Sequence, residues 1–383
     1  MLALEYRPTP QGYAAAKVSQ RAGLASLRLA DLRPPRLVGE DWVVVHPRLA
    51  GICGSDHALL EGHASLYLSS LTSTPFVPGH EVVGLAQGGD WHGRRVVVEP
   101  ALGCEARGVA PACVECDSGR HALCREVTAG TVSAGLQIGF CRQTGGGWSE
   151  ALVAHRSQLH LVPDALSDED AVLTEPLACA IHAVARAELD AGATVAVIGA
   201  GAIGLLTVAA LRESHPDATV VAVAKHRGQD LEARRLGADD VYAPGELHLR
   251  GARLTGARRL VGHGGRELLL GGFDVVFDCV ASGATLESAV TAVRPRGIVV
   301  LVGMPGQIGL DLSLAWQREI DIRGTYAYGD EFPAALELSG RLGLGRLVAH
   351  GWPLAEYRLA LEQSRRATRA GRAKTVFELE CAA

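Results

Sequence analysis

A glycine-rich turn between two apolar segments constrains the fold of this chain more than any other feature. The β-branched run at 195–198 leads into the pattern G-x-G-x-x-G, and an apolar stretch at 205–211 follows it. The first glycine allows a tight turn, the second lets the backbone approach a pyrophosphate, and the third lets helix and strand pack closely. A second apolar run at 219–223 completes a strand–helix–strand unit that binds a dinucleotide. The residues of this turn are Gly199, Gly201, Ala202, Ile203 and Gly204.

The two halves of the chain differ in their rhythm of apolar and polar residues. From about residue 176, strands predicted at 194–198 and 219–223 alternate with helices, which is typical of a doubly wound parallel sheet. The first half has short apolar strands, such as 42–45 and 82–85, between Pro, Gly and charged residues, which indicates an antiparallel, barrel-like domain. Because 383 residues exceed what one compact core usually holds, we expect two domains of these two kinds.

Two short segments bring together the ligand types that zinc prefers. They are Cys53-Gly54-Ser55-Asp56 and Pro78-Gly79-His80-Glu81, which supply a thiolate, an imidazole and a carboxylate. A catalytic zinc needs three protein ligands and an open position, and this set can provide them. Asp56 could accept the free ring N–H of His80 and so fix its tautomer. The alternative is a buried cysteine and a core histidine in two unrelated turns.

Four further cysteines follow with the spacing C-x8-C-x2-C-x7-C. Such a group fits a closed, tetrahedral structural zinc. Two disulfides are the alternative, but the first ten residues do not resemble an export signal, and nine cysteines are an odd number. The sequence therefore predicts a structural zinc with the ligands Cys104, Cys113, Cys116 and Cys124.

Charge and hydropathy argue against two classes of partner. The net charge of −5 gives no electrostatic basis for binding nucleic acid or an anionic membrane. The arginine-rich stretch 250–266 has no aromatic side chains on which bases could stack, so we interpret it as a solvated surface segment. The longest apolar stretch, 195–211, is interrupted by glycines and too short to cross a bilayer comfortably. We expect a cytoplasmic protein that binds neither nucleic acid nor a membrane.

Together these motifs resemble the zinc-dependent medium-chain alcohol dehydrogenase family, over nearly the whole chain. The segment Glu175-Pro176-Leu177-Ala178 is most similar to the polyol branch, which includes sorbitol and threonine dehydrogenase-like members. Classical alcohol dehydrogenases usually carry a cysteine ligand near that point. The other matching features, in the family's order, are 51–56, 77–84, the four cysteines, the glycine turn, 273–279 and 297–303.

The resemblance implies a domain plan. It places a GroES-like, zinc-binding catalytic domain at 1–175, a Rossmann dinucleotide-binding domain at 176–323, and a return to the catalytic domain at 324–383. The catalytic domain would therefore be discontinuous, which the residue pattern alone does not indicate. The resemblance also implies a homodimer or homotetramer.

It further implies the ligands of both metals. Glu81 would be the third ligand of the catalytic zinc after Cys53 and His80, and Glu175 the fourth, either directly or through water. Relatives usually show C-x2-C-x2-C-x7-C, so Cys104 departs from the family by standing behind an insertion, Glu105 to Ala112. A loop this short can fold back to the metal.

Proton transfer is assigned to residues that follow Cys53. Ser55 is the candidate relay, because it lies two residues after the zinc cysteine and carries a hydroxyl group. A simple turn serine is the alternative. Many relatives have a histidine where this chain has Ala58, so either His57, one position earlier, or water would carry the proton onward. Asp56 would support the site as a partner of His80.

Cofactor choice is decided near the end of the second strand, where an acidic residue binds the ribose 2′-hydroxyl of NAD. This chain has Ala224-Lys225-His226-Arg227 there, with no carboxylate and two or three cationic side chains. A cationic turn can pair with a 2′-phosphate, whereas a carboxylate would repel it. The sequence therefore favours NADP, with NAD bound through other contacts as the alternative.

The combined features predict a zinc-dependent oxidoreductase that transfers hydride between NADP and a secondary alcohol, a polyol or a sugar-derived alcohol, or reduces the matching ketone. One alternative is the same chemistry with NAD. An alternative of another class is a catalytically silent zinc- and nucleotide-binding protein. Ser55, Asp56, Glu81 and Glu175 argue against the silent protein, which needs none of them.

Overall fold

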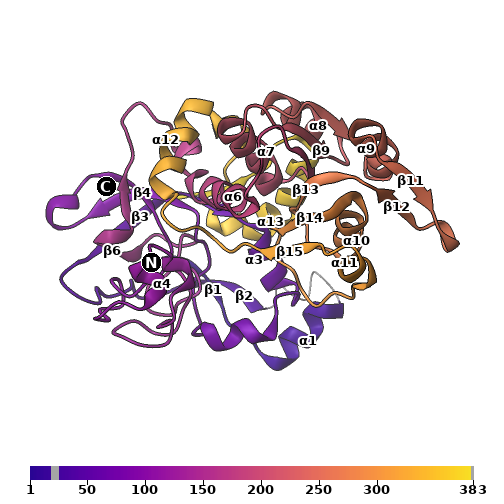
Figure 1. Cartoon of the computed structure of the whole chain (residues 1–383). Coiled ribbons are helices and arrows are strands. Elements are labelled where there is room, and N and C mark those ends of the chain that lie inside the picture. Colours follow the sequence, from indigo (N-terminus) through magenta and orange to yellow (C-terminus); the bar gives the residue numbers. More distant parts are fainter. Residues whose placement is uncertain (19–25, 381–383) are drawn as a thin grey trace. The chain divides into compact units, whose positions relative to one another are not determined.

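The computed structural model describes residues 1–18 and 26–380, and its contacts divide the chain into two compact units. Figure 1 labels many of the elements of both. Neither unit is continuous in sequence. Unit 1 comprises Met1–Ala178, Tyr328–Arg365 and Lys374–Ala383, and unit 2 comprises Cys179–Ala327 and Arg366–Ala373.

Unit 1 is built on an antiparallel sheet in which β3 (Trp42–Ile52) has three partners. The order is β16-β3-β4-β5-β7, and β6 also pairs with β3. Thr375 of β16 lies opposite Ile52, so the C-terminal part of the chain closes the edge beside the end of β3. The other strands are β4 (Val82–Gln87), β5 (Arg95–Val98), β6 (Leu152–His155), β7 (Leu159–Leu161) and β16 (Thr375–Glu378).

Buried β-branched and aliphatic side chains form the core of this sheet. Val45, Val82, Val96 and Leu152 pack in one cluster because alternate residues of each strand point to the same face. The short β1 (Leu2–Tyr6) and β2 (Leu27–Asp31) form a separate antiparallel pair. The helices that lie wholly or partly in this unit are α1 (Pro10–Val18), α3 (Gly54–Leu60), α4 (Val114–Asp117), α5 (Asp168–Ala171), α6 (Thr174–Ala187), α12 (Phe332–Leu342) and α13 (Tyr357–Ala367).

Unit 2 is built on a six-stranded sheet with the order β10-β9-β8-β13-β14-β15, and every pairing is parallel. This is the strand order of a dinucleotide-binding doubly wound fold. The predicted parallel sheet is confirmed, and the strands predicted at 194–198 and 219–223 coincide with β8 and β9. The bounds are β8 (Thr194–Ile198), β9 (Thr219–Val223), β10 (Asp240–Tyr242), β13 (Phe273–Asp278), β14 (Val293–Leu301) and β15 (Asp321–Gly324).

The central strands β8, β9 and β13 of the unit 2 sheet are largely buried and apolar, as expected for a sheet covered on both faces. Val221, Val276 and Val299 belong to one core cluster with Phe273 and Leu286. The helices of this unit, beyond the second part of α6, are α7 (Ala202–Ser214), α8 (Arg227–Arg235), α9 (Leu247–Thr255), α10 (Gly283–Ala292) and α11 (Ser313–Gln317). A 3₁₀ turn, η10 (Thr368–Ala370), packs on α8.

The arginine-rich stretch 250–266 contains the end of α9 and one strand of a hairpin. The strands β11 (Arg258–Val261) and β12 (Glu267–Leu270) form this hairpin, which extends away from the helices of unit 2 in Figure 1. Three arginines of this stretch are paired with acids: Arg250 with Asp240, Arg259 with Glu267 and Arg266 with Glu287. The stretch is therefore a surface segment with its own secondary structure.

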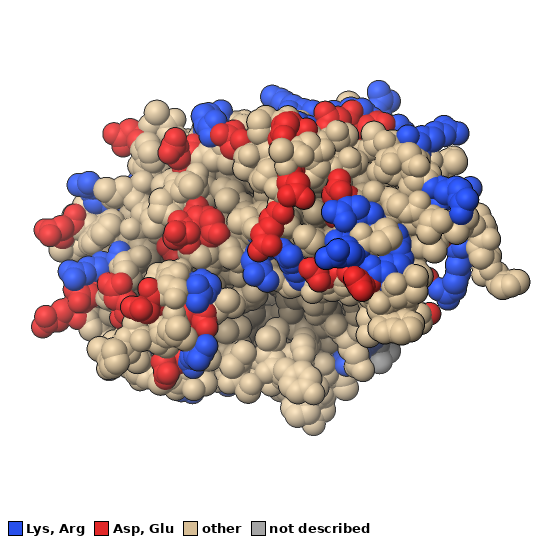
Figure 2. All heavy atoms as spheres, in the orientation of Figure 1, with Lys and Arg blue, Asp and Glu red and all other residues tan. Residues whose placement is uncertain are grey.

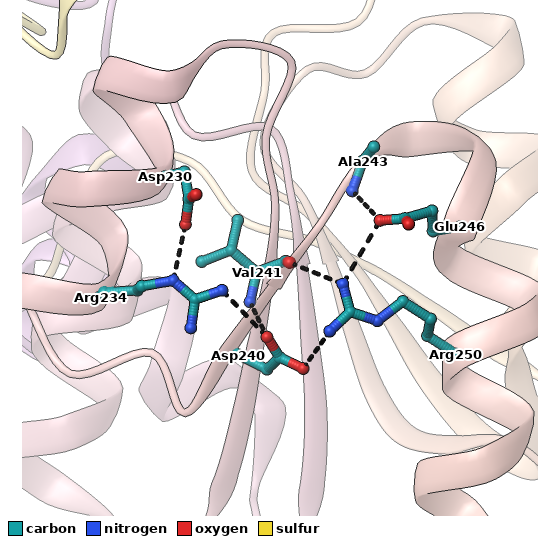
Figure 3. A network of polar contacts seen from close by, with 7 residues as sticks. All are labelled: Asp230, Arg234, Asp240, Val241, Ala243, Glu246 and Arg250. Atoms are coloured by element: carbon teal, nitrogen blue, oxygen red, sulfur yellow. Dashed lines mark hydrogen bonds and ion pairs between the residues drawn. The ribbon is translucent and has the colours of Figure 1, made fainter.

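An ion-pair network ties α8, β10 and α9 together (Figure 3). Arg234 lies between Asp230 and Asp240, and Arg250 bridges Asp240 and Glu246. The pKa of Asp240 stays below its ordinary value, because the Val241 N–H and the two arginines outweigh partial burial, which acts to raise it. These arginines are therefore neutralised within the domain.

The surface carries charges of both signs. On the face shown in Figure 2, Lys and Arg side chains are interspersed with Asp and Glu. Among residues 1–18 and 26–380, no helix is long and apolar enough to cross a membrane.

Candidate metal and cofactor sites

Three of the predicted zinc ligands meet where β3 ends and β4 begins. Cys53 follows β3 and is the N-cap residue of α3, whereas His80 and Glu81 directly precede β4. Because β3 and β4 are antiparallel neighbours, the end of one lies beside the start of the other. One ligand atom from each of the three residues lies within 4.8 Å of the others.

A glycine and a lysine determine where the Glu81 carboxylate lies. Gly51 leaves room for it, since a Cβ atom at this position would come 1.8 Å from Glu81 Oε2. Lys374, which directly precedes β16, is 2% exposed, and its Nζ donates to Glu81 Oε1 at 2.5 Å. Lys374 therefore holds one carboxylate oxygen and leaves the other for a metal.

Unsatisfied polar atoms show that this cluster fits a metal ion. Glu81 Oε2, His80 Nδ1 and Asp56 Oδ1 are buried, and none has a hydrogen-bond partner within the described part of the chain. Buried polar atoms normally have one. Asp56 Oδ2 accepts the Cys53 N–H at 2.8 Å, and Oδ1 lies 4.0 Å from His80 Nδ1. A thiol, an imidazole and a carboxylate converging in this way form the donor set of a catalytic zinc.

The charges of the cluster influence one another. Burial raises the pKa of Asp56 to about 6. Burial acts to lower the pKa of His80, but its contacts with Cys53 and Asp56 raise this pKa by a larger amount. The pKa of His80 therefore lies above its ordinary value. The pKa of Lys374 is raised in the same way, because the attraction of Glu81 outweighs burial. Lys374 therefore remains a cation beside Glu81.

Glu175, the predicted fourth ligand, belongs to the same neighbourhood. It lies in the first turn of α6 and is 6% exposed. Its charge acts on both His80 and Lys374. Lys374 itself was missed by the sequence reasoning. The available signal was a single cation next to the apolar strand Thr375–Glu378, where a buried lysine requires an anion.

The relay candidates Ser55 and His57 lie on α3. Ser55 is half-buried in the first turn. His57 Nε2 lies 2.8 Å from Ser364 Oγ, and its Nδ1 lies 3.3 Å from an Arg365 nitrogen. Because arginine only donates, Nδ1 accepts and Nε2 carries the proton. Burial lowers the pKa of His57 to about 4, and Arg365 adds to the effect. His57 is thus a neutral imidazole held by α13.

The four predicted structural ligands also converge. The sulfur atoms of Cys104, Cys113, Cys116 and Cys124 all lie within 4.8 Å of one another, and all four cysteines are free. Each sulfur accepts a backbone N–H: those of residues 113, 125, 104 and 126, in the order given, at 3.3 to 3.4 Å. Four cysteine sulfur atoms that converge in this way are the donor set of a tetrahedral structural zinc. The loop behind Cys104 brings it to the other three cysteines despite the insertion.

A buried arginine supports this loop. Arg107 is 0% exposed and lies within the insertion after Cys104. Four thiolates around one Zn²⁺ carry a net charge of −2, so a nearby guanidinium offsets part of it. The thiols of Cys104, Cys116 and Cys124 interact electrostatically with Arg107. Its guanidinium donates to five backbone carbonyls, those of Leu102, Ala129, Val132, Ser133 and Gly135.

Each glycine of the dinucleotide turn has a different environment. Gly199 has φ +97°, which favours glycine, and its N–H donates to Val223 O. Gly201 is the N-cap residue of α7, and a Cβ atom there would meet nothing within 4 Å. At Gly204, a Cβ atom would come 1.8 Å from Gly199 O. These are the environments expected for a tight turn, an open approach and close helix–strand packing. Ala202 and Ile203 begin α7.

The predicted cofactor-selecting residues follow β9: Ala224 and Lys225 lie before α8, and Arg227 is its first residue. Ala224 is buried, whereas Lys225 and Arg227 are exposed. The Lys225 N–H donates to Gln229 Oε1, which closes the turn. No carboxylate occupies the position where a 2′-hydroxyl would be bound.

Two family descriptions match most of the chain. "Alcohol dehydrogenase GroES-like domain" matches residues 39–164, and "Zinc-binding dehydrogenase" matches residues 202–341. The chain is 30% identical over 338 residues to a sorbitol dehydrogenase of Bacillus subtilis strain 168, covering 85% of this chain and 87% of that protein. It is 31% identical to a sorbitol dehydrogenase of Arabidopsis thaliana, covering 93% of each.

Solved structures share the fold over the full length. A zinc-binding dehydrogenase from Sinorhizobium meliloti 1021, bound to NADP, superposes with a TM-score of 0.71 at 25% identity. The match covers 99% of this chain and 100% of that one.

Proposed function

The chain belongs to the zinc-dependent medium-chain alcohol dehydrogenase family, in its polyol branch, and from this premise we propose a polyol-type dehydrogenase that prefers NADP. The substrates would be secondary alcohols, polyols or sugar-derived alcohols, or the matching ketones. The observation that carries the proposal is the convergence of Cys53, His80 and Glu81 with one Glu81 oxygen lacking a partner.

In the oxidation, the carbinol C–H bond breaks, its hydride passes to the nicotinamide ring, and the O–H proton leaves. Zinc held by Cys53, His80 and Glu81 would supply the Lewis acidity that favours loss of that proton. Glu175 would complete the ligand set, directly or through water. Lys374 holds the Glu81 carboxylate in place, and a reactive geometry requires ligands fixed in this way.

The other residues would position the metal ligands and accept the proton of the substrate. Lys374 donates to one oxygen of Glu81 and fixes its position, and Asp56 faces His80 Nδ1. The hydroxyl of Ser55 would receive the substrate proton. Because His57 is held in its neutral form, its ring could pass on a proton only by accepting one at Nδ1 and releasing the one at Nε2. Transfer to water is the simpler route.

The test is steady-state kinetics on the zinc-loaded protein with a panel of polyols and secondary alcohols, using NADP⁺ and NAD⁺ in parallel. We expect turnover of at least one polyol and a higher kcat/KM with NADP⁺. Cys53→Ser should lower kcat/KM by roughly 100-fold or more and remove one zinc, because a thiolate ligand is lost. Cys141→Ala is the matched control, since Cys141 is a free cysteine outside both clusters.

Three results would contradict parts of the proposal. A higher kcat/KM with NAD⁺ than with NADP⁺ would leave the proposed reaction unchanged but would reverse the proposed cofactor preference. Bound zinc and nucleotide without turnover of any alcohol would favour a silent binding protein. An unchanged rate in the Cys53 variant would remove this cluster from the reaction.

A further inference from the structure

A short C-terminal segment lies against the turn that selects the cofactor. Residues 366–373 group with unit 2, although the chain on either side belongs to unit 1. Within this segment η10 packs on α8. The C-terminal segment thus brings residues distant in sequence to the first turn of α8, which begins at Arg227.

Two glycines make this approach possible. A Cβ atom on Gly228, in the first turn of α8, would come 2.3 Å from the carbonyl carbon of Ala370. A Cβ atom on Gly371 would come 2.7 Å from Gly228 O, and Gly371 has φ +81°. Backbone therefore lies on backbone at this point, and a side chain at either position would separate the two segments.

The C-terminal segment and its flanks are strongly basic. From residue 363 to residue 377 there are five cations and no acid: Arg365, Arg366, Arg369, Arg372 and Lys374. Of these, Arg369 is exposed and directly precedes the Ala370 that touches Gly228. Nearby acids are already engaged: Asp230 pairs with Arg234, and Glu232, which lies beside Gly371, also has a partner.

Three cations near this turn differ from Arg234 of α8 and Arg250 of α9, which are paired with acids. Lys225, Arg227 and Arg369 form no ion pair with any acid among residues 1–18 and 26–380. By contrast, Arg234 and Arg250 are neutralised in the network of Figure 3. Exposed cations without acidic partners, gathered from two segments, are the groups that bind a phosphate.

We propose that Arg369 completes, with Lys225 and Arg227, a binding site for the 2′-phosphate of the cofactor, so that the C-terminal segment is a specificity determinant for NADP. The inference rests on the proposed function, because it concerns the same cofactor. It adds a residue that lies 142 positions after Arg227 and outside the strand–turn–helix that usually reads the ribose.

The experiment measures dissociation constants of NADP⁺ and NAD⁺ by calorimetric titration of the full-length, zinc-loaded protein. For Arg369→Ala we expect about a tenfold weaker affinity for NADP⁺ and less than about a twofold change for NAD⁺, because one charge-assisted contact is lost. Arg369→Lys should recover part of the affinity, since the charge remains. Adenosine 2′,5′-bisphosphate and 5′-AMP, titrated into the same variants, should reproduce the difference.

Arg253→Ala is the matched control, because Arg253 is an exposed arginine on α9 of the same unit. It should leave both affinities unchanged. Equal weakening of NADP⁺ and NAD⁺ by Arg369→Ala would place Arg369 on the phosphates that both share and overturn the proposal. If Arg369→Ala left the preference for NADP⁺ unchanged, the role of Arg369 would be disproved but the proposed cofactor would stand. If the unmodified protein bound NAD⁺ more tightly than NADP⁺, both the role of Arg369 and the proposed cofactor would be disproved.

Discussion

At His57, two neighbours on α13 fix the protonation of one ring. Arg365 can only donate, so Nδ1 accepts and Nε2–H donates to Ser364 Oγ. The sequence alone offered His57, or water, as the onward carrier of the proton, but it could not predict this partnership, because Ser364 and Arg365 come about three hundred residues later. The neutral form of His57 follows from a contact between distant segments.

This protonation state has a consequence for stability. The pKa of His57 is lowered from 6.5 to about 4, so between these values the unfolded chain binds more protons than the folded one. The free energy of unfolding therefore falls as the pH falls through this window, by at most about 3 kcal/mol from this residue. In His57→Gln that contribution should be absent.

Urea unfolding of both proteins at intervals from pH 7 to pH 4 measures it. His63→Gln serves as the control, since His63 is exposed and lies six residues after His57 in the sequence. Curves for the His57 variant and the unmodified protein that stay parallel over the whole range would disprove the assignment.

At the scale of single elements, the loop after Cys104 is the least predictable part of the site. The cysteine spacing predicted a zinc, but it could not predict how an insertion closes onto the metal. The structure shows that Arg107 does this by donating to carbonyls on both sides of the loop. Its signal in sequence is one arginine among many, so only the packed loop identifies it.

Arg107→Met should therefore lose the structural zinc. The substitution removes a buried charge and leaves several carbonyls without donors, which should cost about 3–5 kcal/mol of stability. We expect zinc to fall from about two ions per chain to about one, measured by atomic absorption, with a lower urea midpoint.

Arg125→Met provides the comparison for this loop. Arg125 contributes its backbone N–H to Cys113 Sγ, but its side chain is largely exposed and pairs with Glu115. That variant should keep both metals. If Arg107→Met also kept two, the loop would hold its metal without the arginine.

At the scale of the molecule, much of the architecture was predictable from local pattern. The glycine turn and the alternating strands predicted the parallel sheet, because those features are contiguous in sequence. The assignment of residues 366–373 to unit 2 was not predictable, since it depends on Gly228 and Gly371 meeting. The role of Lys374 was not predictable for the same reason, because its partner Glu81 lies in the first third of the chain.

Metal removal should affect the two functions of the protein differently. Both cysteine-containing clusters lie in unit 1, whereas the glycine turn lies in unit 2 and includes no metal ligand. A strong chelator should lower the thermal unfolding midpoint, because zinc binds the folded state more tightly than the unfolded one, and it should abolish turnover. Titration of the metal-free protein should still detect NADP⁺ binding.

Calorimetry with and without chelator, followed by return of zinc, provides the measurement. Chelator saturated with zinc beforehand controls for its direct effects. Loss of nucleotide binding together with the metal would show that the two depend on each other.

Because β16 pairs with β3, contacts in the metal site depend on residues that are synthesised near the end of translation. Glu81 leaves the ribosome early, but the cation that compensates it is made almost three hundred residues later. Until then, a nascent chain carries a carboxylate that cannot be buried without cost. Arg369 arrives only five residues before Lys374. A chain whose translation stops short of this stretch would thus lack the partner of Glu81 and the third cation beside α8 together, so a premature stop there should yield an inert protein rather than a partly active one.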